Sequence, residues 1–161
     1  MADLALDHLV FVAEKSALEK FRDAGFSVIS GGKHDDGITA NYLIGLDDGI
    51  YLELLYFVQE DKDHFWWPRS SGWAGYCLLP QPNGSEAFVS HVEKVPNAPD
   101  YDKYTPPRPF QRKTDEGTVL NMKVTFPKET ARNRGRMPFL CEDITSRADR
   151  VRLLIAVVLR K

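Results

Sequence analysis

Three ionisable residues interrupt the most apolar strand-like runs of this chain. They are His8 in LALDHLVFVA (residues 4–13), Glu53 in IYLELLYF (residues 50–57) and Glu142 in RMPFLCEDIT (residues 136–145). Because side chains on a strand alternate between two faces, each is expected to lie among apolar neighbours, as His8 does with Leu6 and Val10. Burying an isolated carboxylate is costly unless it is paired, protonated or bound to a metal.

Metal binding is one chemistry that would explain all three residues. If the three strands curl around one cavity, His8, Glu53 and Glu142 converge there. Imidazole nitrogen and carboxylate oxygen are the ligands expected for Zn²⁺, Mn²⁺, Fe²⁺ or Ni²⁺. The alternative for His8 is a core histidine hydrogen-bonded to the backbone or to a carboxylate. The alternative for the two glutamates is exposure to solvent or an ion pair with an arginine.

The first third of the chain has clear signals for the elements that would position these residues. A strand over residues 4–13 is followed by Ser16 and Glu19, whose spacing predicts a capping box opening a helix that ends near Gly25. Three more strands are predicted, at 26–30, 39–45 and 50–57, the last two joined as a hairpin. His34 falls in the turn-rich GGKHDDG, which predicts a loop.

The same order of elements follows in the second half, after a connecting arm that carries Trp66, Trp67 and Trp73. These tryptophans favour packing at the junction of the two halves over a lid on a pocket. A strand is predicted at 74–79, a helix at 83–95, a hairpin at 110–113 and 118–126, and a last strand at 136–145. We therefore expect a single domain with module one at 4–57, the arm at 58–73, module two at 74–145 and an atypical tail at 146–161.

Composition narrows the class of protein. The chain has 161 residues, 43% hydrophobic and 27% charged, with a net charge of −2, as in a globular protein with a sizeable core. There is no basic field for a nucleic acid, and the longest apolar run, LLIAVVL, is too short to cross a bilayer. The N-terminus lacks a basic signal region, and two cysteines are too few for a disulfide framework, which predicts a cytoplasmic protein.

Several motifs together resemble a known family. The stretch from LDHLVFV to DDGIYLELLYF, with its GGKHDDGITAN loop-and-strand, and the later PFLCEDITSR are similar to the glyoxalase-like branch of the vicinal oxygen chelate superfamily. The resemblance implies an α+β fold in which paired βαβββ modules form a half-open mixed β-barrel with metal ligands pointing inward. It matches His8 to the first-strand ligand, Glu53 to the fourth-strand ligand and Glu142 to the last-strand position.

The resemblance also suggests substrate-binding residues. Thr39 and Asn41 share a face of the third strand that looks into the cavity in this family, and the Asn41 amide could orient a substrate carbonyl. The alternative for Asn41 is a strand asparagine satisfied by a loop backbone. His34 is a further candidate, although a solvated loop histidine is the commoner outcome.

The sequence departs from the family pattern at Gly75, which by alignment stands where the second module should supply a ligand. Three ligands and a water would still make an open catalytic site, but a pocket without metal is equally consistent with this gap.

The first hypothesis is a metal-dependent lyase or isomerase acting on a carbonyl or enediol substrate, with Glu53 or Glu142 as general base. The rival is a non-catalytic small-molecule binding protein using the same cavity, and a third possibility is a truncated, inactive product. A homodimer would suit the fold.

Overall fold

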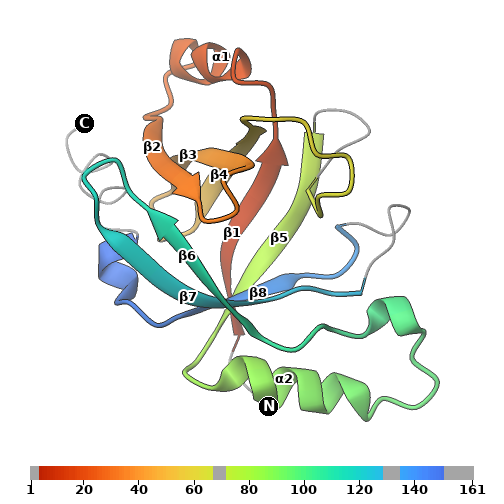
Figure 1. Cartoon of the computed structure of the whole chain (residues 1–161). Helices are drawn as coiled ribbons and strands as arrows, with labels where there is room; N and C mark the ends of the chain where they lie inside the picture. Colours follow the sequence, from red (N-terminus) through yellow and green to blue (C-terminus); the bar gives the residue numbers. More distant parts are fainter. Residues whose placement is uncertain (1–3, 67–71, 129–134, 151–161) are drawn as a thin grey trace.

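The computed structural model describes residues 4–66, 72–128 and 135–150, and its elements occur twice in the order strand, helix, three strands (Figure 1). In chain order they are β1 Leu4–Val12, α1 Ala17–Asp23, β2 Ile29–His34, β3 Thr39–Gly45, β4 Tyr51–Phe57, β5 Gly72–Pro80, α2 Gly84–Glu93, the 3₁₀ turn Asp100–Asp102, β6 Arg108–Lys113, β7 Val119–Thr125 and β8 Phe139–Asp143. A helical turn follows at 147–150. Part of the predicted arm, including Trp67, and residues 151–161 of the predicted tail lie outside the described residues.

The described strands form one mixed barrel in the order β1-β4-β3-β2-β6-β7-β8-β5, with β5 pairing back to β1. The β1–β4 and β5–β8 pairs are parallel and the others antiparallel. This confirms the predicted α+β fold of paired modules in a mixed β-barrel. The seams differ in extent: β1 and β5 pair along almost their whole length, whereas β2 and β6 are joined by two residue pairs, Lys33 with Lys113 and His34 with Arg112.

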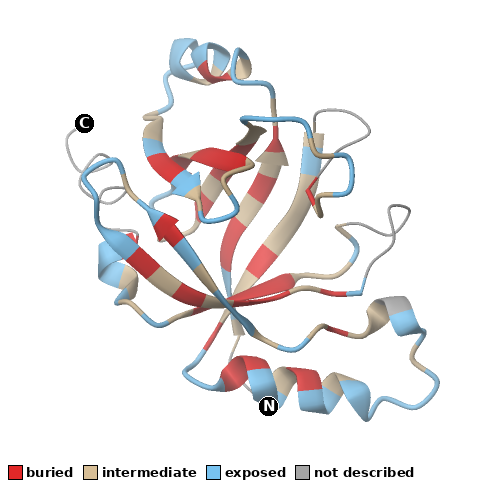
Figure 2. Cartoon of the chain, viewed as in Figure 1, coloured by how far each residue is buried: buried red, intermediate tan, exposed pale blue. Residues whose placement is uncertain are grey.

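Apolar side chains fill the barrel, and the helices cover its outside. The interior cluster contains Val10, Val12, Leu55, Trp66, Cys77, Leu120, Met122, Val124, Phe139 and Cys141. Outside, Leu18 of α1 packs on Ile44 and Leu54, which are the outward residues of β3 and β4. Figure 2 shows buried residues as bands along the strands, whereas the helices are largely exposed. Neither α1 nor α2, nor the helical turn at 147–150, is long and apolar enough to cross a membrane.

The prediction for the second strand is wrong in position. β2 begins three residues later than expected and extends into the segment predicted as a loop as far as His34, which is a strand residue, whereas residues 35–37 form a turn as predicted. The glycines explain the difference, because the backbone at Gly32 has φ +101° and a register shift lies between Ser30 and Gly32, which lets the glycine-rich segment pair with β3. The hairpin of β3 and β4 is confirmed, with Gly45 opposite Tyr51.

Of the two signals that predicted the ends of the first helix, the one for its C-terminus is confirmed and the one for its N-terminus is wrong. Gly25 follows the end of α1 with φ +91°, as predicted for a glycine that terminates a helix. The capping box at Ser16 and Glu19 is wrong, since Ser16 has helical backbone angles and its hydroxyl contacts the Glu14 carboxylate at 3.4 Å instead of a backbone N–H.

A bulge in β1 changes which side chains enter the barrel. Leu6 pairs with Leu78 and His8 with Cys77, so Asp7 is an extra residue between two ladder positions. Asp7 and His8 are therefore both buried, while Leu6 is 38% exposed. Strict alternation, which placed Leu6 on the same face as His8, fails at this residue.

Candidate functional site

A cavity of about 440 Å³ lies inside the barrel, within the usual size range of small-molecule sites. Its walls are largely aromatic, formed by Phe65, Trp66, Phe110, Phe126 and Phe139. Its polar lining includes His34, Thr39 and Glu53, three of the residues singled out from the sequence. Asp35, Asp36, His64 and Arg108 complete the polar lining, so the cavity combines an aromatic wall with an extensive polar side.

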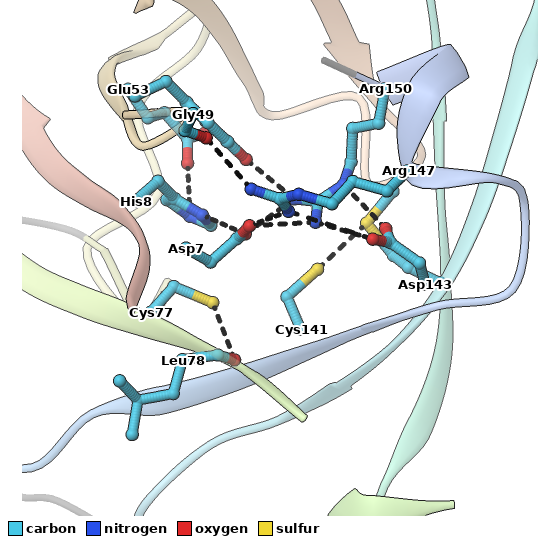
Figure 3. Close-up of polar contacts among 12 residues, drawn as sticks. Asp7, His8, Gly49, Glu53, Cys77, Leu78, Cys141, Asp143, Arg147 and Arg150 are labelled. Carbon is cyan, nitrogen blue, oxygen red and sulfur yellow. Dashed lines mark hydrogen bonds and ion pairs between the residues drawn. The ribbon is translucent and has the colours of Figure 1, made fainter. Parts of the chain in front are cut away.

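His8 and Glu53 meet in the barrel from β1 and β4. His8 Nε2 lies 3.2 Å from Glu53 Oε2, and His8 Nδ1 lies 2.7 Å from Asp7 Oδ2 (Figure 3). Burial opposes the charge of His8, but the hydrogen bonds to Asp7 and Glu53 outweigh it and raise the pKa of His8 to about 9. Burial likewise opposes the charge of Glu53, yet the bond from His8 and its charge lower the pKa of Glu53 to about 2.

Asn41 holds the other oxygen of Glu53, and His34 orients Asn41. Asn41 Nδ2 donates to Glu53 Oε1 at 2.7 Å, and the same nitrogen lies 3.2 Å from His34 Nε2. Thr39 Oγ1 lies 3.2 Å from Asp36 Oδ2, so its proton goes there and it accepts from His34 Nδ1 at 2.7 Å. Burial lowers the pKa of His34, so the ring is neutral and Nε2 is the acceptor for Asn41.

Asp7 is fixed by two arginines that the sequence reading missed. Arg150 forms two bonds to the Asp7 carboxylate, at 2.7 and 3.1 Å, and Arg147 also pairs with Asp7 (Figure 3). Arg150 continues to the Tyr51 hydroxyl at 2.8 Å and to Asp143 at 2.7 Å. The pKa of Asp7 is lowered, because the bonds from His8 and Arg150 outweigh the effect of burial. Asp7, an acidic residue directly beside His8 in an apolar strand, was the signal in the sequence that a buried basic partner was needed.

The structure does not bring Glu142 to this site. On β8 the side chains of Phe139 and Cys141 enter the barrel, so Glu142 lies on the outer face. There it accepts hydrogen bonds from the backbone N–H groups of Asn83 at 2.8 Å and Ser85 at 3.1 Å, at the start of α2. The prediction that Glu142 is a metal ligand or general base in the cavity is therefore wrong in its placement, and the residue stabilises a helix N-terminus instead.

Gly75, the position where the family pattern expects a metal ligand from the second module, has no side chain to supply one. A Cβ atom built at Gly75 would lie 3.4 Å from the Trp66 ring, so the indole occupies this side of the barrel. Trp66 is buried and packs edge-to-face on Phe139, which bears out the predicted packing role, whereas Trp73 is 68% exposed.

Two overlapping sets of metal-ligating groups share His8. Asp7, His8 and Cys77 are buried with ligand atoms all within 4.8 Å of one another, close enough to hold a metal ion. In this set, however, the Asp7 oxygens already accept bonds from two guanidinium groups. His8 and Glu53 form a second pair of possible ligands, in which the Asp7 carboxylate orients the imidazole and Asn41 orients Glu53, as outer hydrogen bonds do around metal ligands.

Comparison with known proteins identifies the family. The glyoxalase-like domain family matches residues 6–155, and no curated protein matches the sequence. A hypothetical protein from Staphylococcus aureus superposes with a TM-score of 0.71 and 18% identity over 94% of this chain, which spans only 64% of that protein. Methylmalonyl-CoA epimerase from Streptomyces coelicolor, in complex with 2-nitronate-propionyl-CoA, gives 0.54 at 13% identity, covering 87% of this chain and 97% of the epimerase. The chain belongs to the glyoxalase-like domain family of the vicinal oxygen chelate superfamily.

Proposed function

We propose that this protein is a small-molecule lyase or isomerase that moves a proton next to a carbonyl group of a substrate held in the 440 Å³ cavity. The observation that carries the proposal is the buried contact of 3.2 Å between His8 Nε2 and Glu53 Oε2, with Glu53 also lining the cavity. Each of the two side chains is oriented by a second residue, Asp7 for His8 and Asn41 for Glu53. Such orientation is what acid–base and metal-assisted chemistry requires.

His8 and Glu53 would hold the divalent ion that this chemistry uses, Zn²⁺, Mn²⁺, Fe²⁺ or Ni²⁺. A bound ion supplies a Lewis acid that polarises the substrate carbonyl. Because the pKa of His8 is raised to about 9 in the metal-free protein, metal uptake must release a proton and should strengthen as pH rises toward that value.

The chain's own residues account for the remaining requirements. Glu53 would accept the proton from a substrate carbon, and its position in the cavity lining and its lowered pKa support this role. The aromatic wall provides an apolar surface for the body of a substrate. The isomerase class is also supported by the fold shared with an epimerase, an enzyme class that inverts a carbon centre.

The second candidate function is binding without catalysis. It is favoured by the second half of the barrel, where Trp66 covers Gly75 and Glu142 points outward, so that neither of these two positions supplies a ligand beside His8 and Glu53. In this case the His8–Glu53 pair would serve as a polar anchor for an aromatic or hydrophobic compound.

Metal content separates the two candidates. We would measure it by elemental analysis of untagged protein purified without chelator, for the wild type, His8→Ala, Glu53→Gln and, as a matched control, Glu142→Gln. The proposal expects about one equivalent of metal, lost in the first two variants and retained in Glu142→Gln. A wild type without metal, and without uptake on titration, would overturn the metalloenzyme proposal and leave the binding protein in first place.

A further inference from the structure

Arg112 is a buried cation that forms no ion pair within the part of the chain that the structure describes. It lies on β6, opposite His34 across the short seam between β2 and β6, and is 5% exposed. Its side chain makes one hydrogen bond, from a terminal guanidinium nitrogen to Asn41 Oδ1 at 3.4 Å, and no ion pair with any residue among 4–66, 72–128 and 135–150. Burying a charge without a partner is costly, so this arrangement needs an explanation.

The other buried charges of the barrel show what Arg112 lacks. Arg150 is equally buried and has both Asp7 and Asp143 as partners. The two carboxylates of the described barrel interior already have partners: Asp7 forms ion pairs with two arginines, and Glu53 contacts His8 and accepts a hydrogen bond from Asn41. No carboxylate of the described interior is therefore left over for Arg112.

A small space lies beside Arg112. A second cavity of about 40 Å³ is lined by Arg112, Asn41, His34 and Glu53, and it shares His34 and Glu53 with the 440 Å³ cavity. Gly31 is required there, since a Cβ atom would lie 2.0 Å from Asn41 Oδ1 and 2.7 Å from the Arg112 guanidinium. Because roughly 10–15 Å³ suffices for one water molecule, this volume has room for a group the size of a carboxylate.

We propose that Arg112 is the carboxylate-binding residue of the site, so that the substrate is a carboxylic acid with an apolar body. The body lies against Phe65, Phe110 and Phe126 in the larger cavity, and the carboxylate reaches the smaller cavity, where the planar guanidinium binds it through two parallel hydrogen bonds. This inference rests on the proposed function for the location of the reacting group and adds the chemical class of the substrate.

The test compares two probes of the same shape, 3-phenylpropionate and its neutral analogue 3-phenylpropionamide, by isothermal titration calorimetry on the metal-free full chain. The wild type should bind the carboxylate at least about tenfold more tightly than the amide, the effect of one charge-assisted bidentate contact. Arg112→Gln should abolish this preference and Arg112→Lys should restore part of it. Arg108→Gln is the matched control, because Arg108 also lines the larger cavity but is exposed and stacks on Phe126.

A preference that survives in Arg112→Gln, or that is lost in Arg108→Gln, would overturn the proposal, as would a wild type that binds the carboxylate no better than the amide or not at all. Thermal unfolding of the wild type gives a reading that needs no variant, since the carboxylate should raise Tm more than the amide does. Neither measurement involves metal or turnover. A failure of the proposed function would therefore leave these results unchanged, and the two failures are distinguishable.

Discussion

The two halves of the barrel share one order of elements and both contribute to its apolar interior, but the buried polar side chains gather mainly in the first half. Strands β1 to β4 place Asp7, His8, Asn41 and Glu53 inside, in a continuous hydrogen-bonded chain. Strands β5, β7 and β8 place Cys77, Met122, Val124, Phe139 and Cys141 inside, with Trp66 packed among them. The polar groups of the candidate site thus come from one half and its apolar wall largely from the other. Arg108 and Arg112 on β6 are exceptions that cross this division.

The difference rests on small changes of register. Glu53 and Glu142 occupy the last strands of their modules, yet one enters the barrel and the other contacts the N-terminus of α2. Moving a strand by one residue exchanges its faces, so a single position decides whether a glutamate belongs to the site or to the scaffold.

The polar half should depend most on Arg150. Arg150→Met leaves Asp7 buried with one arginine fewer and removes the link to Asp143, which should cost about 3–5 kcal/mol of unfolding free energy. Urea denaturation followed by circular dichroism measures this. Arg147→Met is the control, since that side chain is 31% exposed and its loss should cost about 1 kcal/mol. Equal effects in the two variants would contradict the central role of Arg150.

The charges of the polar half should also make stability depend on pH. The pKa of His8 rises from 6.5 to about 9 on folding. Protonated His8 therefore adds to the free energy of unfolding below pH 6.5, and this contribution, on the order of 3 kcal/mol, is lost as pH rises through 9. The pKa of Glu53 falls from 4.5 to about 2, so its contribution is present above pH 4.5 and lost toward pH 2. Stability should therefore be greatest between about pH 4.5 and 6.5.

Denaturation midpoints of the metal-free protein, measured from pH 6.5 to 9, test the His8 contribution. In His8→Gln the decline over this range should largely disappear, because the residue no longer titrates. An unchanged decline in that variant would assign the effect to other groups.

Glu142 tests the assignment of the outer face. Glu142→Gln weakens two charge-assisted bonds to the start of α2 and should cost about 2 kcal/mol of stability while leaving metal and ligand binding intact. Loss of ligand binding without loss of stability would instead return Glu142 to the site.

The apolar half should tolerate substitutions that conserve volume. Met122→Leu keeps the packing beside Cys141 and should change the free energy of unfolding by less than about 1 kcal/mol, without effect on metal content. A large effect would show that this half also serves the site.

The sequence was sufficient for the fold because its strong signals are local. TANYLIG and the hairpin that follows, the glycine that ends α1 and the repeated order of elements all appear in the structure. The sequence also indicated that three side chains face the interior, because each is a polar residue at an inward position of an apolar strand. In the structure these residues, His8, Asn41 and Glu53, contact one another.

The remaining errors have physical causes that a pattern does not reveal. The face of FLCED is ambiguous, since both of its faces are apolar at the start and acidic at the end. The bulge at Asp7 adds a residue to one strand only, and it exists because of pairing with β5. Arg112 and Arg150 were overlooked because charged residues are expected on the surface, and their burial depends on partners far away in the sequence.

The bond between Asp7 and Arg150 also sets when the site is completed during synthesis. The two residues are separated by 143 positions, so Asp7 leaves the ribosome long before its main partner has been made. At roughly 5–20 residues per second the interval is about 7–30 s, during which β1 carries a charged residue destined for the interior. The nascent chain must therefore keep β1 from settling into a stable alternative until nearly all of the described chain has emerged.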